Sequence, residues 1–108
     1  MKTALVTNCK EPFDIAIVHA LLQESFVICF HSDSHLDIFK SLNDHPHFQL
    51  ILGAASNTQM FISLLEIYQP DYYYNFASQI DFDSIGKQVM AKKLVRRIVC
   101  YQTGEPND

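Results

Sequence analysis

The sequence has little positive charge, no long apolar run and few cysteines, and each shortage excludes a class of protein. Eight Lys and Arg against twelve Asp and Glu give a net charge of −4, so no basic field exists to attract nucleic-acid phosphates. No apolar run approaches the roughly 20 residues that cross a bilayer. Met1 and Lys2 lead straight into a short apolar stretch without a cleavage signal, so we expect no signal peptide.

Cysteine is scarce and is not arranged as in a metal site. The three cysteines are odd in number and show no metal-type spacing: Cys9, Cys29 and Cys100. Cys29 lies within a hydrophobic run, which indicates a core position. We expect reduced thiols and a cytoplasmic protein.

The apolar content supports one folded domain. Residues of the hydrophobic class make up 48% of the 108 residues, which is enough for a core and excludes wholesale disorder. We expect a single domain over 1–103 and a tail over 104–108. There is no repeat, linker or low-complexity segment.

Short apolar runs alternate with helix-length segments. Strands are predicted at 4–6, 27–30, 48–52 and 72–77. Helices are predicted at 13–23, after Ser34 with Asp37 completing its cap, at 58–68 and at 82–101. Fully apolar strands that alternate with helices predict an α/β fold with a parallel sheet and right-handed crossovers.

The segment from Tyr68 to Gln79, YQPDYYYNFASQ, carries a family resemblance. It resembles the "QPD-x-x-YNLAAQS" segment of the extended short-chain dehydrogenase/reductase family (NAD-dependent epimerases and dehydratases), and within it the N-terminal part of the GDP-mannose 4,6-dehydratases. Residues 47–57 are similar to the family's "F-x-L-x-x-GDLSD" segment, and 4–7 to its first strand, "ALITG". The resemblance implies a truncated Rossmann-like three-layer fold with about four strands in the order 3-2-1-4. It also implies NAD or NADP as cofactor and a sugar nucleotide as substrate.

The first turn departs from the family's "TG-x-x-G-x-x-G" pattern. Asn8, Glu11 and Asp14 replace its three glycines, which permit a tight bend, close approach of the pyrophosphate and close helix packing. Asn8 tolerates a left-handed backbone. Glu11 and Asp14 place carboxylates where phosphates would sit, and Pro12 removes one backbone donor, so we expect weakened phosphate binding.

The other positions that the resemblance assigns to cofactor binding give a mixed picture. Asp33 fits an acidic ribose-binding position, which favours NAD over NADP, but it also fits an ordinary loop aspartate before a helix cap. Ala54 replaces the family's adenine-contacting aspartate. Ala77 and Ser78 keep the small residues that line the cofactor crevice, although small residues after a strand are also ordinary packing.

Three further groups of residues are candidates for binding sites. Four histidines are close in sequence, but they fall at opposite ends of a predicted helix and are expected to be solvated loop residues rather than metal ligands: His31, His35, His45 and His47. The run Tyr72–Tyr74 could stack on bases, yet its place in a buried strand favours core packing. The one basic cluster is expected to be a solvated helix face: Lys87, Lys92, Lys93, Arg96 and Arg97.

The catalytic residues of the family have no counterpart. No Tyr-x-x-x-Lys motif occurs, and hydride transfer needs a positioned acid or base as well as a held nicotinamide. We therefore expect a degenerate, non-catalytic domain with weak nucleotide binding or none.

Two alternatives to that expectation stay open. One is an interaction module that forms a homodimer or binds a protein partner through the fourth strand, which would be an exposed edge, or through the last helix. The other is the cofactor-binding part of a split dehydratase, whose second chain would supply the missing half.

Overall fold

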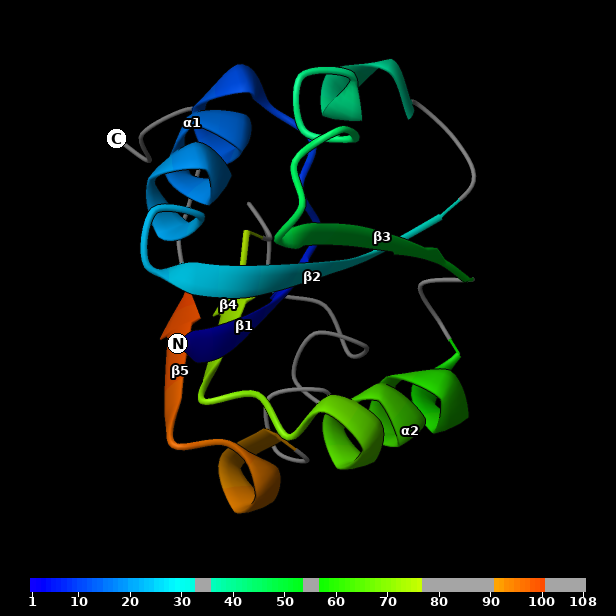
Figure 1. Cartoon of the computed structure of the whole chain (residues 1–108). Helices are drawn as coiled ribbons and strands as arrows, with labels where there is room; N and C mark the ends of the chain where they lie inside the picture. The colour runs from blue at the N-terminus through cyan, green and yellow to red at the C-terminus, as the bar shows by residue number, and fades with distance from the viewer. Residues whose placement is uncertain (33–35, 54–56, 77–90, 101–108) are drawn as a thin grey trace, which may run out of the picture.

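The computed structural model describes residues 1–32, 36–53, 57–76 and 91–100 (Figure 1). They form one parallel sheet of five strands in the order β3-β2-β1-β4-β5. The strands are β1 (Lys2–Thr7), β2 (Ser25–His31), β3 (Phe48–Leu52), β4 (Tyr72–Asn75) and β5 (Arg97–Cys100). The helices are α1 (Pro12–Leu21), a 3₁₀ turn η1 (Leu36–Phe39) and α2 (Thr58–Tyr68). The predicted α/β class, the parallel sheet and the order 3-2-1-4 are confirmed.

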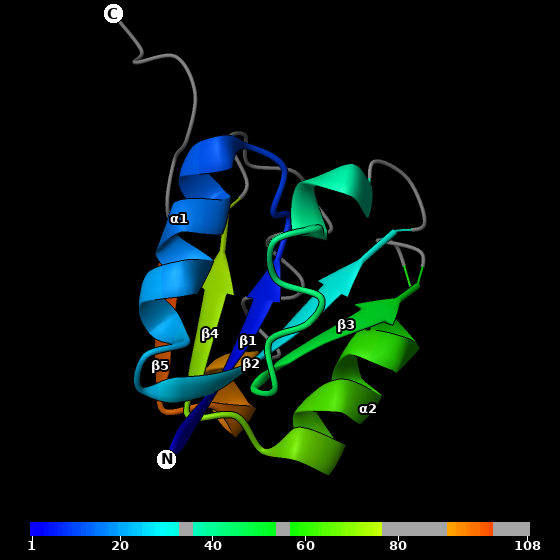
Figure 2. The same ribbon diagram turned by 45° about the horizontal axis from the view of Figure 1, so that its top comes forward.

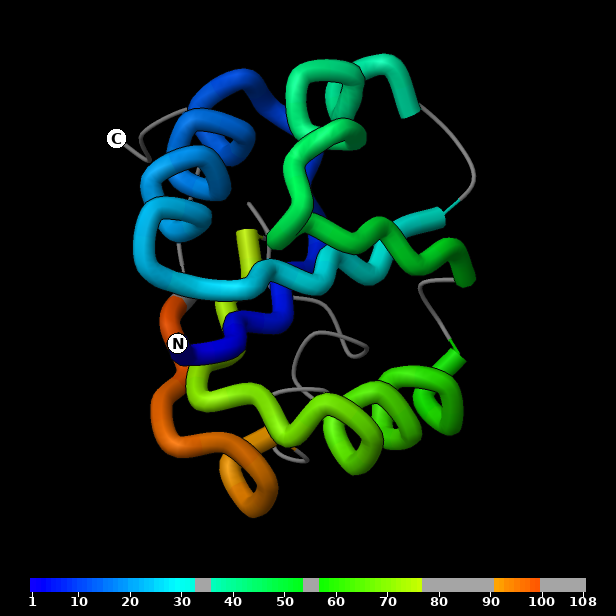
Figure 3. Tube along the Cα trace, in the orientation of Figure 1, coloured from blue at the N-terminus to red at the C-terminus, as the bar shows by residue number. Residues whose placement is uncertain are grey.

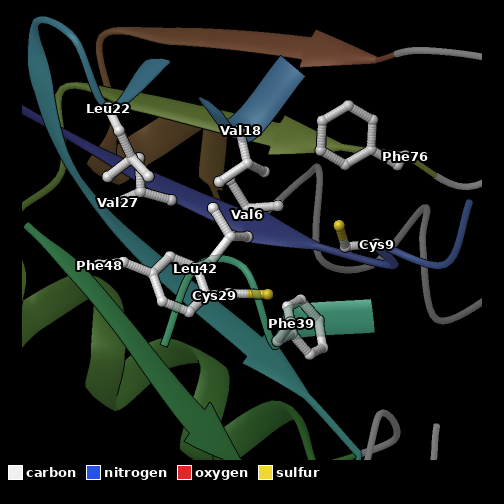
Figure 4. Packing of buried hydrophobic residues seen from close by; sticks show 10 residues of the cluster. All are labelled: Val6, Cys9, Val18, Leu22, Val27, Cys29, Phe39, Leu42, Phe48 and Phe76. Atoms are coloured by element: carbon white, nitrogen blue, oxygen red, sulfur yellow. The ribbon is translucent and has the colours of Figure 1, made fainter. Parts of the chain in front are cut away.

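Helices cover both faces of the sheet, as a parallel sheet requires. The chain trace places α1 and η1 on one side and α2 on the other (Figures 1 and 3). Side chains alternate accordingly. On the α1 side, Val6 and Cys29 join a buried cluster with Val18 of α1 and Phe39 (Figure 4). On the α2 side, Leu5, Ile28 and Tyr73 pack against apolar residues of α2, among them Phe61 and Leu65.

The predicted helix at 82–101 is wrong in its last part. Arg97–Cys100 is a strand that pairs with β4 along the register Tyr72↔Arg97 to Asn75↔Cys100, and only residues 91–94 of the described part are helical. The spacing of Val95 and Ile98 fits a helix, but the run Ile98-Val99 is β-branched and suits a strand equally well. Pairing with β4 decided between them.

That fifth strand corrects the interpretation of β4 as an exposed edge. β4 is hydrogen-bonded to β1 on one side and to β5 on the other, so its backbone is not open to a partner. The edges of the described sheet are β3 and β5. Any association through backbone pairing must therefore use one of those strands.

The predicted helix after Ser34 is only the single turn η1. Phe39 and Leu42 are fully buried, and Leu36 packs against the same cluster, as the apolar spacing predicted. Ser34 and His35 lie outside the described residues.

Asp71, within the segment that carries the family resemblance, ties the amino ends of the sheet together. Its carboxylate accepts a hydrogen bond from Thr3 N at 3.0 Å, and its own amide donates to Thr3 O at 2.8 Å. Its carbonyl oxygen accepts from the amides of Arg96 and Arg97 at 3.1 and 3.2 Å. The aspartate of that segment therefore has a structural role between β1, β4 and β5.

The described cations of the basic cluster are exposed: Lys92, Lys93, Arg96 and Arg97. Arg97 lies in β5 rather than on a helix, and Lys87 falls outside the described residues. A search of the described part of the chain for a helix able to cross a membrane finds none.

Candidate nucleotide site at the first turn

The turn that links β1 to α1 lies at the carboxyl edge of the sheet, where the strands point in Figure 2. Open α/β sheets bind ligands at this edge, where the strand order reverses. Here that place is between β1 and β4, because β2 and β3 continue on the other side of β1. The register sets Thr7 beside Phe30 of β2 and beside Asn75 of β4.

Asn8 starts the turn in a left-handed conformation, with φ of 62°. The sequence indicated only that Asn8 tolerates this backbone, and the structure shows that Asn8 adopts it. The Asn8 side chain also donates a hydrogen bond from Nδ2 to Asn75 Oδ1 at 2.7 Å. The turn is therefore fastened to β4 by a contact that glycine could not make.

A buried polar cluster continues from that contact. Thr7 Oγ1 lies 2.8 Å from Tyr73 Oη and 3.4 Å from Asn75 Oδ1. All three side chains are almost completely buried, so these hydrogen bonds offset the cost of removing polar groups from water. The sequence analysis missed this cluster. Its signal was the polar residue that ends each of two apolar strands, β1 and β4.

Asp14 lies in the first turn of α1, and its carboxylate reaches back to the residues that precede the helix. Its Oδ2 accepts hydrogen bonds from the amides of Lys10, at 2.9 Å, and Glu11, at 3.0 Å. The residue is fully buried, and its Oδ1 has no hydrogen-bond partner. A carboxylate is favourable here because the first turn of a helix presents unpaired N–H groups and the positive end of the helix dipole.

The remaining donors of the turn are mostly used as well. Pro12, at the first helical position, has no N–H. The amides of Asp14 and Ile15 donate to the Glu11 carbonyl oxygen at 2.9 and 3.2 Å. Four of the amides that could donate to a phosphate are therefore already hydrogen-bonded inside the chain: those of Lys10, Glu11, Asp14 and Ile15.

The cavity that the described residues line above the turn is small. A cavity of about 100 Å³ lies between the ends of β1 and β2. It is lined by Thr7, Asn8, Cys9, Lys10, Phe30, His31 and Ser32. Pockets that hold drug-sized ligands and cofactors measure roughly 300–1,000 Å³, so this cavity is closer to the size of one phosphate group than to that of a dinucleotide.

Cys9 and Cys29 are free, buried thiols at the floor of this region. In Figure 4 both point into the cluster between α1 and η1. A hydrogen bond that the Cys29 thiol donates to the Cys9 side chain, together with burial, raises the pKa of the Cys29 thiol well above its ordinary value. Cys29 is thus a core residue, as expected, and is held as a neutral thiol.

The structure places only one of the predicted cofactor-binding residues. Asn8 lies in the turn and contacts Asn75, whereas Asp33, Ala54, Ala77 and Ser78 lie outside the described residues. The described residues hold no group of three or more His, Cys, Asp or Glu side chains that could bind a metal ion. Of the tyrosine run, Tyr73 is a core residue, and Tyr72 and Tyr74 are half-buried.

Comparison with known proteins supports the fold but at low identity. No protein-family model matches the sequence, and no curated protein does. Among solved structures, dTDP-glucose 4,6-dehydratase from Bacillus anthracis in complex with NAD has a TM-score of 0.70 at 20% identity, covering 99% of this chain and 42% of that chain.

Two further structures agree with it. A short-chain dehydrogenase/reductase from Veillonella parvula in complex with NADP has a TM-score of 0.72 at 14% identity, covering 92% of this chain and 46% of that one. The Bordetella bronchiseptica enzyme WbmG in complex with NAD has a TM-score of 0.72 at 15% identity, covering 92% and 36%. The chain spans less than half the length of these proteins, and its fold is like that of the extended short-chain dehydrogenases/reductases.

Proposed function

We propose that this chain is a non-catalytic Rossmann-like domain with weak affinity, or none, for NAD and NADP at its first turn. The observation that carries the proposal is the buried carboxylate of Asp14 on the amides of Lys10 and Glu11. In a dinucleotide-binding turn, such amides and the helix dipole face the pyrophosphate. Here a phosphate would have to displace a like charge that already holds those donors.

Two further features support the proposal. Glu11 adds a second carboxylate at the N-cap of α1, and repulsion between anions lowers the affinity for phosphate. The sequence contains no Tyr-x-x-x-Lys motif, so we expect no hydride transfer by these 108 residues alone. Asp33 still favours NAD over NADP if a residual affinity exists.

Ligand-dependent thermal stability tests this proposal. A ligand that binds only the folded state adds RT ln(1 + [L]/Kd) to stability. We expect no change in Tm with NAD, NADP or GDP-mannose at micromolar concentration and at most a small, unsaturated rise at millimolar concentration, while a dTDP-glucose 4,6-dehydratase measured in parallel with NAD is stabilised. A rise in Tm that saturates at micromolar concentration of either dinucleotide would overturn the proposal.

A groove between α1 and the β4–β5 part of the sheet favours a second function, as an interaction module. It has a volume of about 750 Å³ and is lined by Met1, Lys2, Ile17, Ala20, Leu21, Glu24, Ser25, Tyr72, Tyr74 and Arg97.

The occupant favoured for this groove is a second copy of the chain. Its lining carries both signs of charge, Lys2 and Arg97 against Glu24, and a twofold contact places such opposite charges across from each other. Light scattering at high concentration should detect a dimer that Tyr74→Ser weakens. Ile67→Ser, at an exposed position on α2, is the matched control. A strict monomer would exclude self-association.

Co-purification of a chain with a Tyr-x-x-x-Lys motif would instead favour a split dehydratase.

A further inference from the structure

We propose that Cys9 and Cys29 form a reactive dithiol pair, which hydrogen peroxide converts to an intramolecular disulfide that fastens the first turn to β2. Both cysteines are free and buried, and they belong to the same cluster on the α1 side of the sheet. This chemistry needs no nucleotide, so it stands apart from the proposed function and is tested separately.

The fold brings the two thiols together although they are distant in sequence. Cys29 pairs with Val6 in the register between β1 and β2, and both side chains lie in the cluster on the α1 side. The turn that starts at Asn8, with φ of 62°, is followed by Cys9, whose side chain joins the same cluster (Figure 4). The Cys29 thiol donates a hydrogen bond to the Cys9 side chain. Thiols in contact need only a small movement to reach bonding distance.

The cavity at the ends of β1 and β2 gives one of the two cysteines a route to small molecules. Cys9 is among the residues that line this space of about 100 Å³, and Cys29 is not. A water molecule takes about 30 Å³ of liquid volume, and hydrogen peroxide is little larger, so the cavity can hold it. Because both cysteines are otherwise fully buried, an oxidant as large as oxidised glutathione cannot reach them. The cavity therefore selects a small peroxide.

The position of each cysteine assigns its part in the reaction. The Cys9 sulfur attacks one oxygen of hydrogen peroxide, the O–O bond breaks, and a sulfenic acid on Cys9 and one water are formed. The Cys29 sulfur then attacks the Cys9 sulfur, the S–O bond breaks, and the hydroxyl leaves with the Cys29 proton as a second water. The two thiols lose two electrons, which the peroxide gains.

Cys29 suits the second step rather than the first. Its hydrogen bond to Cys9, together with burial, raises the pKa of the Cys29 thiol, and a neutral thiol is a poor nucleophile. Cys29 nevertheless lies in contact with Cys9, so it is already in place to attack a sulfenic acid formed there. Peroxide should therefore modify Cys9 first.

Peptide mapping by mass spectrometry tests the proposal on the natural chain after treatment with millimolar hydrogen peroxide. We expect a peptide pair that joins Cys9 to Cys29, is lighter by two hydrogen atoms, and separates again on addition of dithiothreitol. Cys100→Ser, which keeps the pair, is the matched control and should give the same joined peptides. Oxidised glutathione at equal concentration should form the bond far more slowly, because the cavity excludes it.

Two variants separate the roles of the cysteines. In Cys29→Ser the sulfenic acid on Cys9 meets no second thiol, so dimedone should trap it. In Cys9→Ser the remaining Cys29 should stay unmodified. Far-UV circular dichroism establishes folding, and Cys29→Ala or Cys9→Ala replaces a serine variant that does not fold. Unjoined cysteines in the peroxide-treated natural chain, a bond to Cys100, equal rates with oxidised glutathione, or dimedone on Cys29 would each overturn the proposal.

Discussion

Replacement of Asn8 by alanine should destabilise the fold by about 2 kcal/mol. Roughly 1 kcal/mol comes from holding an ordinary side chain in the left-handed region, because Asn8 has φ of 62°. About 1 kcal/mol more comes from the lost hydrogen bond to Asn75 Oδ1, which is 2.7 Å long and joins the turn to a buried side chain of β4.

Asn8→Gly separates the two contributions. Glycine adopts the left-handed backbone freely but cannot hydrogen-bond to Asn75. We expect Asn8→Gly to be less destabilised than Asn8→Ala by about 1 kcal/mol. Both variants lose the hydrogen bond to Asn75, but only alanine also has the cost of the left-handed backbone. Asn8→Asp keeps the tolerance of this backbone and nearly the same shape, but its carboxylate faces Asn75 Oδ1 without a donor. It should be at least as destabilised as Asn8→Gly.

Urea denaturation measures these differences as shifts in the midpoint at constant m-value. Asn43→Ala, at an exposed position beyond η1, is the control and should change stability by no more than about 0.5 kcal/mol. A double-mutant cycle with Asn75→Ala isolates the coupling between the two side chains. Equal stability of Asn8→Ala and Asn8→Gly would refute the backbone argument, and zero coupling would refute the hydrogen-bond argument.

Three other substitutions test the fold. Gln69→Gly should stabilise by about 0.5–1 kcal/mol in urea denaturation, because Gln69 caps α2 with φ of 44°; a loss of stability would contradict this. The raised pKa of Cys29 means that only the unfolded state ionises readily. The free energy of unfolding should therefore decrease above about pH 8.5, and this decrease should be smaller in Cys29→Ala. An equal decrease in Cys29→Ala would contradict the assignment to Cys29. Phe39→Ala should cost about 3–5 kcal/mol by thermal or urea unfolding, since Phe39 is fully buried beside His31 and Phe48; a cost below 1 kcal/mol would mean that the cluster repacks.

The sequence by itself determined the alternation of strands and helices from β1 to α2, apart from the length of η1. The apolar runs and the helical spacing of Phe61, Leu64 and Leu65 predicted β3 and α2 with the observed bounds, because local periodicity reports which face of an element is buried. The tolerance of Asn8 for a left-handed backbone was also predicted, since few residue types share it.

Tertiary structure decided what depends on contacts distant in sequence. Whether the run Ile98-Val99 became helix or strand depended on pairing with β4. The cluster of Thr7, Tyr73 and Asn75 exists only because β1 and β4 lie side by side in one register. Glu11 and Asp14 looked equivalent in the sequence as carboxylates opposed to phosphate. In the folded turn Glu11 is exposed, whereas Asp14 is buried and its carboxylate accepts hydrogen bonds from the amides of Lys10 and Glu11. Only the tertiary structure decides this difference, because the packing of α1 against the sheet fixes the direction of each side chain relative to those amides.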